Sequence, residues 1–273
     1  MSIDFSDIVD DRLTGKSPLE CARKVELRML RIFDRICKEY GLSYCLAYGT
    51  LLGAVRHGGF IPWDDDIDVH MPLTDYRKFV TIAKDVLPDD IGLYCGPNTQ
   101  CGFGKLIDHN SFYLDVTSKM TQGPIPNGIF VDIFPIRRYL SGWLHVKTTR
   151  FVRYAKLHSL GFGNVTVANL LSKWFWRTVL NCILYPIDFL NSRGRGKLAG
   201  IPQRMWGCAA MLPEWPFPCT TVNFEGFEFP APKSIDKYLK SMYGDFMKLP
   251  PVEKRFFHAR IIVPLLKSVN EEF

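Results

Sequence analysis

Four aspartates close together carry the clearest chemical signal of this chain. Residues 48–69 read YGTLLGAVRHGGFIPWDDDIDV, and Asp66 and Asp68 stand two apart where acidic and apolar residues alternate. Residues at this spacing on a β-strand point to the same face. Two carboxylates aimed at one point repel each other unless a cation lies between them, and Mg²⁺ is the usual cation where substrate phosphates complete the coordination. The spacing therefore predicts a magnesium site.

Asp132 is a candidate third carboxylate, because it is the only acid in the apolar stretch 129–134. A charged group in a buried strand is costly unless it is paired or bound to metal. Three carboxylates on neighbouring strands can hold two metal ions about 3.5–4 Å apart, a clamp for displacement at phosphorus. We predict Asp66, Asp68 and Asp132 as catalytic metal ligands for two Mg²⁺ ions, with Mn²⁺ as the alternative. Asp64 is a weaker candidate, because acids after a Pro-Trp pair also suit a solvated turn.

The Gly49-Thr50 pair is a candidate phosphate site. Glycine lets the backbone approach a phosphate, and a threonine at a helix start adds a hydroxyl to N–H groups that favour anions. The pair alone is weak evidence, but it lies sixteen residues before Asp66. Further candidates for balancing nucleotide phosphates are the basic residues Arg56, His57 and Lys105. His258 is a weaker candidate for the same site.

The hydrophobic pattern predicts the elements that position these residues. A helix begins at the Ser17-Pro18 cap, with Glu20 completing a capping box, and ends at Gly41. The further expected elements are a strand at 44–48, a helix at 50–56, a strand at 66–71, a helix at 74–86, short strands within 91–117, a strand at 129–134, helices at 143–160 and 167–191, a hairpin at 222–229 and a helix at 234–243. This order favours an α+β (α/β) fold with a small mixed sheet.

Charge is distributed unevenly along the chain. The net charge is +6, yet residues 137–204 contain twelve Lys and Arg against one acid, Asp188, which makes this segment +11 and the remainder −5. Such asymmetry suggests either an anionic partner or a solvated basic face. The eight cysteines form no CxxC pair, so we expect reduced core thiols in a cytosolic protein. The N-terminus shows no signal-peptide pattern.

The apolar stretch 169–190 has three interpretations. Two basic residues, one acid and Pro186 interrupt it, which argues against a membrane-spanning helix. A core-packed helix is one alternative. An interfacial helix is the other, with Trp174 and Trp176 at headgroup depth and the basic run Arg193 to Lys197 beside it. We expect residues 138–204 to be helical and to present a basic, aromatic face to an anionic acceptor or a membrane.

Gly49-Thr50, Asp66-x-Asp68 and Asp132 resemble the three-part signature of the nucleotidyltransferase superfamily. The whole run 48–69 closely resembles the LicD family, whose members attach phosphocholine or ribitol phosphate to glycans. The likeness covers about residues 20–135 and resumes in short motifs near the end of the chain. It implies one nucleotidyltransferase-like domain over 1–273, with a catalytic core at 17–135, a basic helical insertion at 138–215 and a returning segment at 216–273.

The resemblance also implies a reaction. A CDP-linked alcohol would donate a phospho-alcohol to a glycan or a lipid-linked glycan, and CMP would leave. Asp66 and Asp68 would hold Mg²⁺, Asp132 would complete the site and could act as base, and Gly49 and Thr50 would hold donor phosphate. The expected location is cytoplasmic, with possible peripheral contact with an anionic membrane at its inner face, and no nucleic acid partner is expected.

Three other functions stay open. A nucleotidyltransferase would act on a small molecule or a nucleic acid and release pyrophosphate. A sugar-nucleotide glycosyltransferase would release a nucleoside diphosphate, but its Asp-x-Asp normally follows a longer nucleotide-binding half. A catalytically silent glycan- or membrane-binding module is disfavoured by the intact acids at positions 66, 68 and 132.

Overall fold

The structure is a computed structural model that describes residues 3–95, 103–115, 126–160, 167–192, 196–200, 211–255 and 257–265. It contains two units, Met1–Phe134 with Phe217–Phe273, and Pro135–Pro216. The helices and strands of the first unit are η1 (Arg12–Thr14), α1 (Pro18–Glu39), β1 (Cys45–Leu46), α2 (Tyr48–His57), β2 (Ile67–Pro72), α3 (Leu73–Val86), β3 (Ile91–Tyr94), β4 (Gly104–Asp108), β5 (Phe112–Asp115), the start of β6 (Phe130–Tyr139), β9 (Thr220–Phe224), β10 (Phe227–Ala231), α7 (Ile235–Tyr243), η3 (Val252–Lys254) and β11 (Ala259–Val263).

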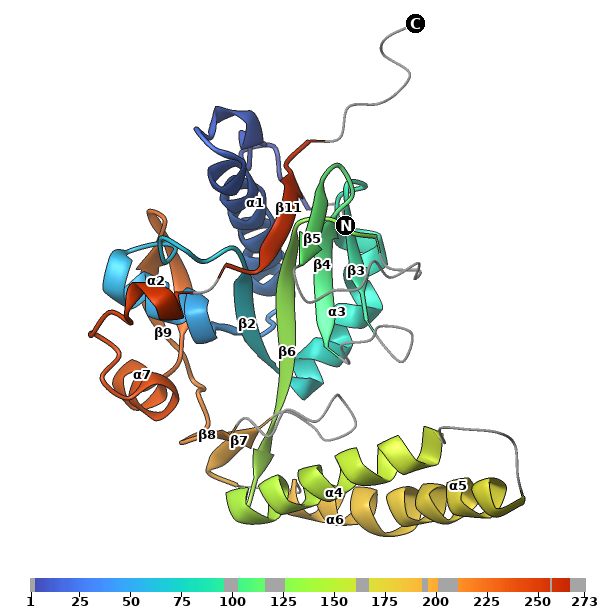
Figure 1. Cartoon of the computed structure of the whole chain (residues 1–273). Coiled ribbons are helices and arrows are strands. Elements are labelled where there is room, and N and C mark those ends of the chain that lie inside the picture. Colours follow the sequence, from blue (N-terminus) through green and yellow to red (C-terminus); the bar gives the residue numbers. More distant parts are fainter. Residues whose placement is uncertain are drawn as a thin grey trace, which may run out of the picture. The chain divides into compact units, whose positions relative to one another are not determined.

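The central sheet of the first unit has the strand order β1-β2-β6-β4-β3 (Figure 1). Strands β1 and β2, β4 and β6, and β3 and β4 pair antiparallel, and Lys105 on β4 lies opposite Asp132 on β6. Helices α1 and α3 lie behind these strands in Figure 1. The predicted class, a mixed sheet flanked by helices, is confirmed. Strand β2 therefore lies beside β6, so the strands that carry Asp68 and Asp132 are neighbours.

Helix α1 follows its sequence signals closely. Ser17 accepts the N–H of Glu20 (3.2 Å), and Pro18 is the first helical residue. Glu20 accepts the N–H of Lys16 (2.7 Å), so the predicted return bond to Ser17 is wrong in this detail. The apolar positions of the helix are buried in the core, and these are Val25, Met29, Ile32, Phe33 and Ile36. Helix α1 therefore buries its apolar face in the core of this unit.

Other predicted elements agree apart from their ends. The helix expected at 50–56 begins at Tyr48 and ends before Gly58, whose φ of 71° suits glycine. The hairpin β9–β10 turns at Gly226 as predicted. The prediction missed β11, which pairs with β5. Figure 1 shows β11 beside β5, although they are far apart in the sequence.

The second unit is mostly helical. After the end of β6 it contains α4 (Gly142–Leu160), α5 (Val167–Val179), the π-helical segment η2 (Leu180–Leu184), α6 (Tyr185–Asn191), β7 (Leu198–Gly200) and β8 (Met211–Leu212). The continuous helix expected at 167–191 is interrupted by η2, which ends two positions before Pro186. A proline lacks the N–H that a regular helix would use, so a register change at this point is physically reasonable. Within the described residues, no helix has the length and apolar character needed to cross a membrane.

The six cysteines in the described residues are free. Cys21, Cys37 and Cys45 are buried as expected, and burial raises the pKa of the Cys37 and Cys45 thiols well above the ordinary value. Cys182 is exposed, so the expectation of a core thiol is wrong there, because it lies on the outer side of η2. Cys101 and Cys208 lie outside the described residues.

Candidate active site

The loop that leads into β2 is held in place by an arginine of α1. Arg23 donates from Nη2 to the carbonyl oxygens of Ile61 (2.8 Å) and Asp64 (2.7 Å), and from Nε to the latter (3.1 Å). Charge-assisted bonds of this kind are among the stronger ones in proteins. They fix the backbone at the point where the run of aspartates begins, so the carboxylates have defined directions.

Asp66 and Asp68 share an electrostatic environment that disfavours negative charge. Burial and then the charge of Asp64 raise the pKa of Asp66 to about 7, although His258 and Lys105 oppose the rise. Burial, Asp66 and Asp132 raise the pKa of Asp68 well above its ordinary value. The charges of Asp66 and Asp132 act on Asp68, which indicates that these carboxylates share one region of the structure.

Asp132 joins this group from the neighbouring strand β6. Its side chain is buried, and burial raises its pKa to about 6, while Lys105 lowers it and Asp66 raises it. Nζ of Lys105 lies 2.6 Å from Oδ1 of Asp132 and 3.4 Å from the ring centre of Phe130. The structure thus brings Asp66, Asp132 and Lys105 into one region. Lys105 forms an ion pair with Asp132 and lowers the pKa of both carboxyl groups.

The start of α2 faces the same carboxylates. A Cβ on Gly49 would lie 2.6 Å from Oδ2 of Asp64, so an alanine at this position would make that carboxylate move. Ala47, the residue that precedes the helix, has no side chain that can cap it. Oγ1 of Thr50 accepts the backbone N–H of Asp68 (2.8 Å), which ties the helix start to β2. The N–H of Tyr48 donates to the hydroxyl of Tyr238 (3.1 Å), so a phosphate that arrives with a cation would be bound by the N–H groups that follow it.

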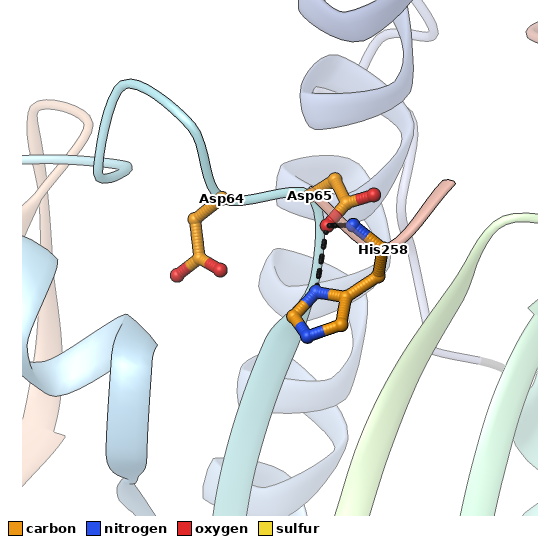
Figure 2. Close-up of side chains that lie close together, drawn as sticks. All are labelled: Asp64, Asp65 and His258. Atoms are coloured by element: carbon orange, nitrogen blue, oxygen red, sulfur yellow. Dashed lines mark hydrogen bonds and ion pairs between the residues drawn. The ribbon is translucent and has the colours of Figure 1, made fainter. Parts of the chain in front are cut away.

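Asp65 has a different set of partners from Asp66, Asp68 and Asp132. Its two carboxylate oxygens accept the hydroxyl of Tyr113 (2.9 Å), the backbone N–H and Nδ1 of His258 (3.3 and 3.0 Å) and the N–H of Ala259 (2.6 Å). Figure 2 shows Asp65 turned toward His258 and Asp64 turned to the other side. Asp65 therefore attaches the segment before β11 to the site, and it accounts for how His258 reaches this region.

His258 carries a pKa that reflects its acidic surroundings. Burial lowers the pKa, but the hydrogen bond to Asp65 and the charges of Asp66, Asp65 and Asp64 outweigh that effect, so the net shift is upward. The imidazole is therefore more readily cationic than an ordinary histidine. One ligand atom each from Asp64, Asp65 and His258 lie within 4.8 Å of one another. Because Asp65 accepts four hydrogen bonds, we interpret these three residues as a structural contact that attaches the segment before β11 to the loop before β2, rather than as a metal centre.

Arg56 and His57 lie on the last turn of α2, at the opposite end from Gly49. Eight residues of helix separate Gly49 from His57, which is about 12 Å along the axis. Arg56 donates to the carbonyl oxygen of Phe246 (3.1 Å) and to Nε2 of His57 (3.0 Å). The structure therefore does not bring His57 to the carboxylates, and a phosphate role for Arg56 stays a prediction.

Glu26 and Tyr243 belong to this region but were missed in the sequence. Glu26 on α1 is 1% exposed, and its Oε2 has no hydrogen-bond partner among the described residues. Burial and then the charges of Asp66, Asp65 and Asp64 raise its pKa well above the ordinary value. Burial and the charges of Asp68, Asp64 and Asp66 likewise raise the pKa of Tyr243. In the sequence, Glu26 is one of several polar residues of the predicted helix, and no local pattern indicates that its side chain is buried near the aspartates.

The carboxylates described here are of the kind that a hard divalent cation binds, although among the described residues only Asp64, Asp65 and His258 place one ligand atom each within 4.8 Å of one another. Oxygen atoms from several carboxylates are the ligands that Mg²⁺ accepts, and they repel one another without it. The unpaired buried Oε2 of Glu26 is an additional oxygen with no other use in the described residues. Lys105 carries one positive charge and offsets only part of the negative charge of Asp66, Asp68 and Asp132. When all three carboxylates are ionised, their remaining negative charge would therefore attract a cation.

Comparison with known proteins places these residues in context. The family description "LicD/FKTN/FKRP, nucleotidyltransferase domain" matches residues 41–160, which include Asp64 to Asp132. The lipopolysaccharide cholinephosphotransferase LicD of Haemophilus influenzae is 30% identical over 261 residues, covering 85% of this chain and 92% of that protein. The chain belongs to the LicD family.

More distant members of the comparison match shorter stretches. The human ribitol 5-phosphate transferase FKRP is 45% identical over 53 residues, which cover 18% of this chain and 11% of that protein. The yeast mannosyltransferase regulator 4 is 40% identical over 45 residues, or 16% of this chain and 4% of that protein. Likeness to the bacterial LicD protein therefore extends over most of the chain, including regions outside the matched nucleotidyltransferase domain.

One LicD-like motif near the end of the chain has a structural role here. Oε1 of Glu225, in the β9–β10 turn, accepts the N–H of Phe60 (2.9 Å), and the N–H of Glu225 donates to the carbonyl oxygen of Gly58 (2.9 Å). A Cβ on Gly59 would collide with the Glu225 carboxylate at 2.0 Å. The hairpin β9–β10 thus holds the loop between α2 and the aspartates in place.

Proposed function

We propose that this chain transfers a phospho-alcohol, such as phosphocholine, from a CDP-linked donor to a hydroxyl of a cell-surface glycan or its lipid-linked precursor. The proposal is supported by the placement of Asp68 and Asp132 on the neighbouring strands β2 and β6, with Asp66 directly before β2, in a chain that is 30% identical to a lipopolysaccharide cholinephosphotransferase over 85% of its length. Such an arrangement suits chemistry at a diphosphate, because catalysis there is mostly positioning and charge stabilisation.

In the proposed reaction the acceptor oxygen forms a bond to the phosphorus that bears the alcohol. The bond from that phosphorus to the bridging oxygen breaks, and CMP leaves with the electron pair. Bound Mg²⁺ would supply positive charge that stabilises the diphosphate and the departing CMP. Asp66 and Asp68 would hold the cation, and the backbone N–H groups of Gly49 and Thr50 would orient a donor phosphate.

Asp132 is the proposed acceptor for the hydroxyl proton. Its pKa of about 6 leaves it ionised at neutral pH, yet more basic than an ordinary aspartate. Lys105 holds it in place at 2.6 Å and favours the ionised form. The reaction would then take place at the cytoplasmic face of the membrane, where CDP-linked donors are made and lipid-linked glycans can be reached.

The test is product analysis with four donors. The purified chain is incubated with CDP-choline, CDP-ribitol, CDP-glycerol or CDP-ethanolamine, with Mg²⁺ or with EDTA, and CMP is measured by chromatography. We expect Mg²⁺-dependent CMP release from one donor, and loss of release in Asp66→Asn. Asp236→Asn is the matched control, because this α7 carboxylate is exposed and pairs only with Lys240 among the described residues.

Two parallel incubations test the alternative enzyme classes, and product from either one would contradict the proposed phospho-alcohol transfer. Pyrophosphate released from CTP and phosphocholine would identify a nucleotidyltransferase. UDP released from a UDP-sugar would identify a glycosyltransferase. Absence of turnover with every donor, in a protein that still binds glycan or membrane, would support a silent binding module.

A further inference from the structure

The helical unit buries one side of its helices and exposes apolar side chains on the other. Val152 and Ala155 of α4 pack with Leu180 and Leu184 of η2, and Trp176 lies against this cluster. Figure 1 shows α4 lying along α5 and α6. The interior of the unit is therefore already filled, so the apolar residues on its outer side are not needed for its core.

The outer side of α4 combines aromatic and basic residues. Five exposed residues lie on one face of α4, because they follow one another at spacings of four, three, one and three. They are Trp143, Lys147, Arg150, Phe151 and Tyr154. Trp143 is 70% exposed and Phe151 is 63% exposed. Nζ of Lys147 lies 5.9 Å from the ring centre of Trp143. This face of α4 is thus amphipathic, with exposed aromatic rings next to basic side chains.

The outer side of α5 has the same character. Leu171, Trp174 and Phe175 are exposed at spacings of three and one, and Trp174 is 70% exposed. Arg177 is exposed one turn further along the helix. The apolar surface continues beyond α5 with Ile183 on η2. Monomeric soluble proteins rarely leave this many large apolar side chains together on one face, so the surface points to a partner.

The charge of the unit indicates which partner it is. Residues 135–216 contain twelve Lys and Arg against two acids, a net charge of +10. One of the acids, Asp188, is buried 3.5 Å from Nδ1 of His145, so it does not reduce the surface charge. A face between two protein copies is depleted of lysine at its centre. Here lysine and arginine are interleaved with the exposed aromatics, as on helices that lie at a membrane surface.

We propose that the outer face of α4 and α5, defined by Trp143, Lys147, Arg150, Phe151, Leu171, Trp174 and Phe175, docks on the surface of an anionic lipid bilayer. The aromatic rings enter the headgroup region, and the basic side chains extend to lipid phosphates. This goes beyond the transfer reaction and does not depend on it.

The experiment is vesicle flotation of the full chain. Vesicles of phosphatidylcholine alone are compared with vesicles that also contain phosphatidylglycerol, at low and high salt. We expect flotation with the anionic vesicles only, and a steep loss as salt rises, because screening shortens the range of surface charge. The double variant Lys147→Gln/Arg150→Gln should weaken binding about twenty-five-fold, since each basic residue near an anionic surface contributes about fivefold.

A second variant tests the aromatic contribution. Trp143→Ala/Trp174→Ala should bind at least about tenfold more weakly at any salt concentration, and it should lose the fluorescence quenching that brominated lipids cause. Leu13→Ala is the matched apolar control, because Leu13 is 69% exposed in the other unit. Lys78→Gln is the matched charge control on α3, and both controls should bind like the wild type.

Three outcomes would overturn the proposal. They are no flotation of the wild type at low salt, equal flotation of the aromatic variant and wild type, or a dimer in solution that the aromatic variant dissociates. If the aromatic variant does not fold, the basic variant still decides the question. CMP release from the soluble donor is measured on the same preparations, so failure of membrane binding and failure of the proposed transfer are separate results.

Discussion

Replacing Asp132 by asparagine should stabilise the metal-free protein above neutral pH and abolish transfer. Asp132 is 7% exposed, and burial raises its carboxyl pKa from 3.8 to about 6 even though Lys105 lowers it. In the unfolded chain this carboxyl loses its proton near its ordinary pKa of about 4. Between that pH and about 6 the folded state therefore binds more protons than the unfolded state, and stability falls as the pH rises.

The size of this effect follows from the shift. A rise from 3.8 to about 6 is roughly two pKa units, and each unit corresponds to about 1.4 kcal/mol, so ionised Asp132 costs the folded state about 3 kcal/mol. Asparagine cannot ionise and has nearly the same shape. Asp132→Asn should therefore have a free energy of unfolding about 3 kcal/mol above the wild type near pH 8, and an equal one near pH 4.

Urea denaturation in EDTA at both pH values measures this difference. Asp108→Asn is a control with the opposite expected sign, because Asp108 is also buried (0% exposed) but accepts two hydrogen bonds from Arg12 at 2.7 and 2.9 Å. Removing one partner of a buried ion pair costs about 3–5 kcal/mol. If Asp132→Asn lost stability in the same way, the pair with Lys105 would be a structural ion pair and the metal-site reasoning would be refuted.

Three further predictions test the rest of the site. Asp66→Asn and Asp68→Asn should keep the fold, by circular dichroism, and lose at least tenfold in rate, about 1.4 kcal/mol of barrier; a folded variant with more activity would contradict their assignment as ligands. Gly49→Ala should also lose at least tenfold, because its Cβ would displace the Asp64 carboxylate; unchanged kinetics would show that Asp64 does not need this position. Glu26→Gln should raise the melting temperature in EDTA and reduce the further rise that Mg²⁺ produces, and an equal Mg²⁺ effect in variant and wild type would remove Glu26 from the cation site.

Local sequence signals predicted most of the fold because they act over a few residues. The cap at Ser17, the alternation in 66–71 and the turn at Gly226 each fix a backbone conformation without help from distant residues. Strand β11 had no such signal. It is a strand because its backbone pairs with β5 and because Ala259 donates to Asp65, and both partners lie more than a hundred residues earlier.

The same distinction explains the run of aspartates. Strand alternation assigned Asp66 and Asp68 to one face, since that rule depends only on spacing. Asp66 is the residue directly before β2, and Asp64 and Asp65 lie further out in the loop, where alternation does not apply and distant residues set their directions. The space left by Gly49 admits Asp64, and the N–H groups of His258 and Ala259 hold Asp65. Adjacent aspartates therefore differ in role because each contacts a different segment that is distant in the sequence. Residues 64–68 alone contain no information about those contacts.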